Sequence, residues 1–329
     1  MSESQLATPP SVPVEEWGRR LTDAVRAALD EGDLDGALRL VREGDGQARN
    51  LATEYFLMFK GLLGTARAIV DVLLEGPTDG LPVLFHDFRT RFADAVNGAF
   101  GDITGVLPPM SDDPAAEVDG TWALLTLGLS RFEDGQRALA ATVERAIEAG
   151  DVAEARRALD EKVSRQYLPM HDSLIRFFAD AMAWVHRRGG ADELLRFQLA
   201  VAQGQRVGID RWEALPVADF ARTFAFLLKQ HMGQLEVREE DDRFVFDQAL
   251  CGSGGRLIAA GAYEGPGALP MVEDAPALNA GRPSFPVYCT HCPGWNAVAP
   301  EQWYGHAHVE YPDPARPTGG CTLHILKNR

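Results

Sequence analysis

Residues 251–256 read CGSGGR, residues 289–292 read CTHC, and residues 319–326 read GGCTLHIL. These three stretches hold all four cysteines, Cys251, Cys289, Cys292 and Cys321, and each cysteine lies near a glycine or in a turn. Residues of strand-like composition precede the first cysteine, and an alternating, strand-like segment follows the last one. Upstream, the chain has helical periodicity and no cysteine. The sequence therefore predicts a mainly α protein that ends in a small α+β domain.

The helical part contains two similar turns, Gly32-Asp33 and Gly150-Asp151. In each, the glycine is expected to end one helix and the aspartate to cap the next. We interpret this as a duplicated helical-bundle unit, with copy 1 at 15–130 and copy 2 at 131–235. Residues 1–14 are predicted to be a disordered arm, and 236–329 a Cys/His-rich domain.

Local patterns predict individual elements. Hydrophobic spacing indicates helices over 14–31, 34–43 and 49–75. Strands are expected near 243–246, 287–288, 307–311 and 322–326, and the four acidic residues at 239–242 are expected to form a solvated turn.

The four cysteines predict a metal site. Thiolates of Cys251, Cys289, Cys292 and Cys321 match the tetrahedral sulfur set that zinc prefers, with iron as the alternative. Three of them with one open position would serve catalysis. Buried apolar cysteines and a redox C-x-x-C are the other interpretations, although Pro293 directly after the motif disfavours the redox one.

Histidines near the cysteines are candidates for proton transfer. His291 lies inside the C-x-x-C and is a candidate general acid or base. In a strand, His306, His308 and Glu310 would share one face and resemble a facial metal triad. The competing interpretation is a solvated strand face.

Arg256 is a candidate for binding a substrate carboxylate through its guanidinium group. A structural ion pair is the alternative role. The surrounding CGSGGR lacks the spacing of phosphate-binding loops, so nucleotide binding is not predicted.

Composition limits the partners. The chain has 329 residues and a net charge of −16, which disfavours nucleic acids and anionic membranes. No targeting or transmembrane segment is expected, and the cysteine usage favours a cytoplasmic protein. A small-molecule substrate is therefore predicted, and the sequence leaves a homo-oligomer open.

The motifs CGSGGR (251–256), YCTHC (288–292) and GCTLHI (320–325) resemble those of a group of bacterial proteins of unassigned function. That group combines a helical N-terminal part with a C-terminal CGSGGR…YCxHC…C domain. More distantly, the last 90 residues resemble L-2-amino-thiazoline-4-carboxylate hydrolase and 4-vinyl reductase-like domains. The second resemblance implies a strand leading to a cysteine, a second cysteine cluster and a closing strand.

Two functional hypotheses follow. The first is a metal-dependent enzyme of hydrolase or lyase type, acting on a small polar metabolite, with His291, His306, His308 and Arg256 assisting. The second is a non-enzymatic protein that binds a ligand or partner and uses the cysteines for a structural zinc ion.

Overall fold

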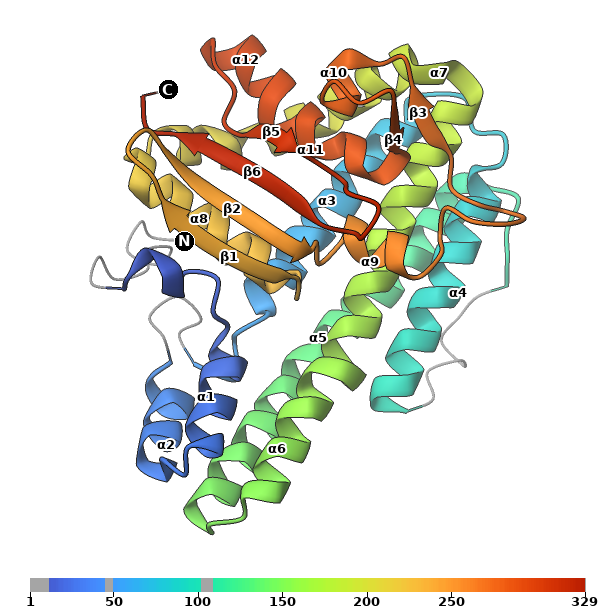
Figure 1. Cartoon of the computed structure of the whole chain (residues 1–329). Helices are drawn as coiled ribbons and strands as arrows, with labels where there is room; N and C mark the ends of the chain where they lie inside the picture. Colours follow the sequence, from blue (N-terminus) through green and yellow to red (C-terminus); the bar gives the residue numbers. More distant parts are fainter. Residues whose placement is uncertain (1–11, 45–49, 102–108, 329) are drawn as a thin grey trace. The chain divides into compact units, whose positions relative to one another are not determined.

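The computed structural model describes residues 12–44, 50–101 and 109–328, and the chain divides into two compact units (Figure 1). The first unit comprises Arg19–Leu63 and Pro77–Leu174, and the second comprises Val12–Gly18, Gly64–Gly76 and Ile175–Arg329. Both β-sheets of the described residues belong to the second unit. The predicted class, mainly α with a C-terminal α+β region, is therefore confirmed. The predicted divisions at residues 130 and 235 stay predictions.

The N-terminal two thirds of the described chain are helical. The helices are α1 (Leu21–Asp30), α2 (Leu34–Glu43), α3 (Phe56–Leu74), α4 (Leu81–Phe100), α5 (Pro114–Glu148), α6 (Val152–Asp160), α7 (Leu168–Glu213) and α8 (Val217–Gln230). A π-helical turn (Glu161–Tyr167) joins α6 to α7, and Gly190 interrupts the helical backbone of α7.

Both Gly-Asp turns form as predicted. Gly32 and Gly150 adopt left-handed φ angles of 75° and 71°, which glycine tolerates without strain. The Asp33 side chain accepts a hydrogen bond from the Gly36 amide, and the Asp151 side chain accepts one from the Glu154 amide. These local caps explain why α2 and α6 begin where they do.

The two helical hairpins share one hydrophobic core within the first unit. Leu21 and Val25 of α1 pack in the same cluster as Val143 of α5 and Leu159 of α6. Ion pairs flank this core: Arg26 contacts Asp160 at 2.5 Å, and Arg42 contacts Glu144 at 2.6 Å. These pairs are half-exposed, so their contribution to stability is small.

A buried polar cluster lies deeper in the first unit. Lys162, in the π-helical turn, is fully buried, and its Nζ lies 3.7 Å from Glu54 Oε2 and 4.2 Å from the Tyr55 ring centroid. Glu54 also accepts a hydrogen bond from the Thr22 amide at the start of α1. The carboxylate therefore caps α1 from outside and partly neutralises the buried ammonium group.

Two of the predicted helices begin later than expected. The expected helix over 14–31 is broken, because a 3₁₀ turn (Val14–Glu16) precedes the separate helix α1. Between them, Trp17 is buried, and its ring centroid lies 5.5 Å from that of Phe244 within the second unit. Helix α3 begins at Phe56 instead of residue 49.

The second unit is built on an antiparallel sheet in the order β1-β2-β6-β5. Its strands are β1 (Gln234–Glu239), β2 (Arg243–Leu250), β5 (Glu310–Asp313) and β6 (Cys321–Leu326). Helix α8 lies along one face of this sheet (Figure 1). Phe220 and Phe224 of α8 pack there with Phe246 and Leu323, and burying such a side chain stabilises the fold by about 1.5–3 kcal/mol.

Short elements connect β2 to β5. They are α9 (Gly254–Ala259), β3 (Met271–Glu273), α10 (Pro276–Asn279), β4 (Ser284–Pro286), a 3₁₀ turn (Val287–Thr290), α11 (His291–Pro293), a π-helical segment (Gly294–Val298) and α12 (Ala299–Tyr304). The strand expected at 287–288 is therefore wrong, since the chain turns there after Pro286. The strands expected at 243–246 and 322–326 are confirmed as β2 and β6.

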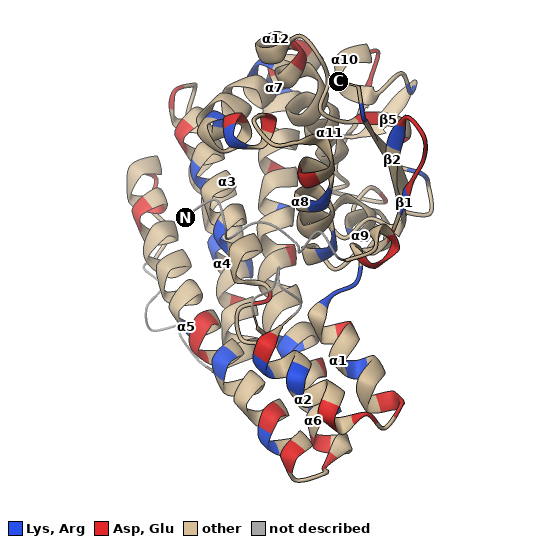
Figure 2. Cartoon of the chain, turned by 90° about the vertical axis from the view of Figure 1, so that its left-hand side faces the viewer, with Lys and Arg blue, Asp and Glu red and all other residues tan. Residues whose placement is uncertain are grey.

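The acidic turn at 239–242 is exposed, as predicted, and appears in red between β1 and β2 in Figure 2. In the part of the chain that the structure describes, every helix is too short or too polar to cross a lipid bilayer.

Candidate functional site

The four cysteines belong to the second unit and lie around one end of its main sheet. Cys251 follows β2, and Cys321 opens the neighbouring strand β6. The Cys251 amide donates to the Gly319 carbonyl at 2.8 Å, which holds the two segments together. Cys289 and Cys292 come from the turn and short helix after β4. All four are free, half-buried thiols.

The glycines of CGSGGR allow the chain segments to pack closely. A Cβ on Gly255 would lie 2.1 Å from the Gly319 carbonyl oxygen, and one on Gly254 would lie 2.8 Å from Cys289 Sγ. No side chain fits at these separations. The glycines of the motif therefore let the Cys251 turn pack directly against the segments that carry Gly319 and Cys289.

The three cysteine-bearing segments lie close together, because Gly255 packs against Gly319 and Gly254 packs against Cys289. Burial raises the pKa of Cys289 and Cys292 well above the usual thiol value, and raises that of Cys321 to about 12. In each case the neighbouring charge of Cys251 raises it further. No three of the sulfur atoms, however, approach within 4.8 Å of one another in the described structure.

The side chains of His291 and Arg256 each donate a hydrogen bond to a backbone carbonyl. His291 Nδ1 donates to the Tyr288 carbonyl at 2.5 Å, and burial lowers its pKa to about 4. Its Nε2 lies 3.5 Å from Cys292 Sγ. Arg256 Nη1 donates to the His231 carbonyl at 2.7 Å. Their predicted roles in catalysis stay predictions.

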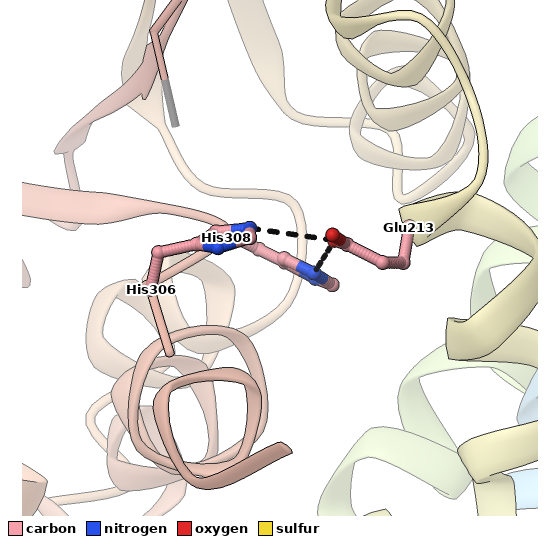
Figure 3. A group of neighbouring side chains, drawn as sticks. All are labelled: Glu213, His306 and His308. Atoms are coloured by element: carbon pink, nitrogen blue, oxygen red, sulfur yellow. Dashed lines mark hydrogen bonds and ion pairs between the residues drawn. The ribbon is translucent and has the colours of Figure 1, made fainter. Parts of the chain in front are cut away.

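A second cluster joins Glu213, the last residue of α7, to His306 and His308 (Figure 3). One carboxylate oxygen, Glu213 Oε2, lies 3.4 Å from His306 Nε2 and 2.7 Å from His308 Nε2. The metal-binding atoms of all three side chains lie within 4.8 Å of one another. His306 Nε2 is buried and has no hydrogen-bond partner among the described residues.

The triad differs from the one expected from sequence. His306 and His308 lie in a loop before β5, so the predicted strand face with Glu310 does not form. Glu310 is exposed and pairs with His324 across β5 and β6. The carboxylate that meets both imidazoles is Glu213, which sequence reasoning missed because no local pattern connects it to the histidines.

Asn296 holds the histidine loop. Its backbone carbonyl accepts hydrogen bonds from the amides of His308 and Val309, both at 3.0 Å. Its side chain donates to the Cys292 carbonyl at 3.1 Å. This residue of the π-helical segment therefore connects the C-x-x-C turn to the loop that carries His306 and His308.

Comparison with known proteins shows that no family model, no curated protein and no solved structure matches the chain.

Proposed function

We propose that Glu213, His306 and His308 bind a divalent zinc or iron ion, and that the protein is a metal-dependent enzyme acting on a small polar metabolite. The observation that carries this proposal is the convergence of two imidazole nitrogens on one carboxylate oxygen, with His306 Nε2 buried and lacking a hydrogen bond. Two histidines and one carboxylate are a common ligand set for zinc and for non-haem iron.

The spacing suits a shared ion. With metal–ligand bonds of about 2.1 Å, ligand atoms at tetrahedral or octahedral angles lie about 3.0–3.4 Å apart. The Glu213–His306 separation of 3.4 Å falls in this range, and the Glu213–His308 separation of 2.7 Å is slightly shorter. A small adjustment of one side chain would therefore admit the ion.

Three protein ligands leave coordination positions for water and substrate. An ion held by these three residues would supply Lewis acidity for the activation of water or of a substrate oxygen. The His308 side chain is 3% exposed, whereas His306 and Glu213 are 27% and 28% exposed. Substrate would therefore approach the ion from the side of His306 and Glu213.

The remaining properties agree with a small-molecule enzyme of the cytoplasm. The net charge of −16 disfavours nucleic acid and anionic membrane partners. Four free thiols are typical of a reducing compartment.

Metal titration of the purified protein tests the proposal. Isothermal calorimetry with Zn²⁺, and with Fe²⁺ under anaerobic conditions, should give about one tight site per chain. His306→Ala, His308→Ala and Glu213→Gln should each weaken binding by at least about tenfold, since each removes a direct ligand. His186→Ala, a change at a partly buried histidine outside the cluster, is the matched control. Equal affinities for all four variants and the wild type would exclude this site.

A second candidate function rests on the cysteines. Because a charge on Cys251 affects the thiols of Cys289, Cys292 and Cys321, the four side chains share one region. Rotation of the side chains around a zinc ion would close a structural Cys₄ site, and the protein would then be a non-enzymatic ligand- or partner-binding module. In that case Cys289→Ser, and not His306→Ala, abolishes the tight site.

A further inference from the structure

We infer that Tyr304 is a positioning residue for the metal site, holding the His308 ring in the orientation that directs Nε2 toward Glu213. This inference depends on the proposed metal site. It assigns a role to Tyr304 and Asp210, neither of which is a ligand.

Two aromatic rings confine His308. The Tyr304 ring is stacked on the imidazole, with centroids 5.3 Å apart and planes only 7° from parallel. Phe220, from α8, meets the imidazole edge-on at 5.2 Å and 63°. A ring contacted both by a parallel ring and by an edge has little freedom to rotate. His308 is also 3% exposed, so water does not compete for its position.

Tyr304 is itself anchored to α7. Its hydroxyl donates to Asp210 Oδ1 at 2.5 Å. Asp210 precedes Glu213 by three residues, which places both carboxylates on one face of the helix. Helix α7 therefore supplies a ligand and also the anchor of the residue that orients a second ligand.

A neighbouring contact strengthens the same attachment. Arg206, one turn before Asp210, lies with its guanidinium 5.0 Å from the centroid of the Trp303 ring, and its Nε lies 3.5 Å from Asp210 Oδ1. Successive turns of α7 thus contact Trp303, Tyr304 and the two histidines in order. The end of α12 and the histidine loop are held along the helix that carries Glu213.

The expected consequence is preorganisation. Residues that orient a metal ligand without touching the ion typically change affinity by 10- to 100-fold. Removing the Tyr304 ring would let the imidazole sample other orientations, and the ion would then have to order it. Removing only the hydroxyl would keep the stacking and release the anchor, with a smaller effect.

The test measures Zn²⁺ affinity by competition with a chromophoric chelator and records the visible absorption spectrum of the Co²⁺-loaded protein. Tyr304→Leu should weaken Zn²⁺ binding at least about tenfold and alter the Co²⁺ spectrum, and Tyr304→Phe should have an intermediate effect. Asp210→Ala should match Tyr304→Phe. Asp210→Asn keeps an oxygen acceptor for the hydroxyl and should restore wild-type affinity.

Trp184→Leu is the matched control, since it removes an aromatic ring of α7 that contacts the Arg188 guanidinium and lies outside the ring contacts of His308 in the described structure. It should bind Zn²⁺ within about twofold of wild type, whereas residues that orient a ligand change affinity by 10- to 100-fold. Melting temperatures of the metal-free variants establish that each one folds. If His306→Ala weakens metal binding but Tyr304→Leu binds metal as the wild type does, with an unchanged Co²⁺ spectrum, the positioning role is wrong and the metal site stands. If His306→Ala and Tyr304→Leu both bind as the wild type does, the ion lies elsewhere and both proposals are wrong. If the wild type binds none, both proposals fall.

Discussion

Replacing Lys162 with methionine should change how the stability of the first unit depends on pH. The Lys162 side chain is fully buried, and its Nζ has no hydrogen-bond partner among the described residues. Burial lowers its pKa from 10.5 to about 8, and the opposing charge of Glu54 only partly offsets this effect. The charged ammonium is therefore less favourable in the folded chain than in the unfolded chain.

Proton binding decides whether stability rises or falls with pH. Between pH 8 and 10.5 the unfolded chain keeps the Lys162 proton, while the folded chain has lost it. Stability contributed by this group therefore rises with pH across that window. At about 1.4 kcal/mol per pH unit, the difference in pKa corresponds to about 3 kcal/mol in total, most of which is gained between pH 7 and pH 10.

Urea unfolding followed by far-UV circular dichroism at pH 7 and pH 10 measures this difference. The wild type should gain about 2–3 kcal/mol relative to Lys162→Met between the two pH values. Lys60→Met, at an exposed position of α3, should behave like the wild type. Identical pH dependence in the wild type and Lys162→Met would show that Lys162 titrates as a solvated lysine, and the account of the buried cluster would be wrong.

Two further predictions concern the second unit. Gly255→Ala should prevent the cysteine-bearing turns from packing, because the new Cβ would lie 2.1 Å from the Gly319 carbonyl oxygen. Gly64→Ala in α3 meets nothing within 4 Å and should raise stability by about 0.5–1 kcal/mol, so equal melting temperatures for the two variants would contradict this reasoning. Asn296→Ala removes the hydrogen bond to the Cys292 carbonyl and should lower the free energy of unfolding by about 1 kcal/mol in urea titrations. An unchanged value would mean that this bond contributes nothing net to the histidine loop.

Local signals in the sequence predicted the parts of the fold that depend on neighbouring residues. The caps at Asp33 and Asp151 form because each aspartate bonds an amide three residues away. Strand β6 follows its alternating apolar pattern, and β2 follows its consecutive β-branched and aromatic residues. The break at Trp17 was not predictable in this way, because the ring is drawn into the core of the second unit by Phe244, far along the chain.

In the candidate site, too, local sequence patterns predicted some features, and tertiary packing determined the others. His306 and His308 were recognised as a pair, but the strand expected there does not form. Gly305 ends α12 with a φ of 87°, and the Asn296 carbonyl captures the amides of His308 and Val309 that a strand ladder would need. Glu213 was missed because it meets the histidines only through tertiary packing, and a glutamate at a helix end carries no distinguishing pattern.

X-ray absorption spectroscopy of the zinc-loaded protein tests the central claim most directly, because it reports which atoms bind the ion. Coordination by Glu213, His306 and His308 predicts only nitrogen and oxygen scatterers at about 2.0–2.2 Å, together with the outer-shell pattern of two imidazole rings. Sulfur scatterers at about 2.3 Å would place the ion on the cysteines and contradict the proposed site.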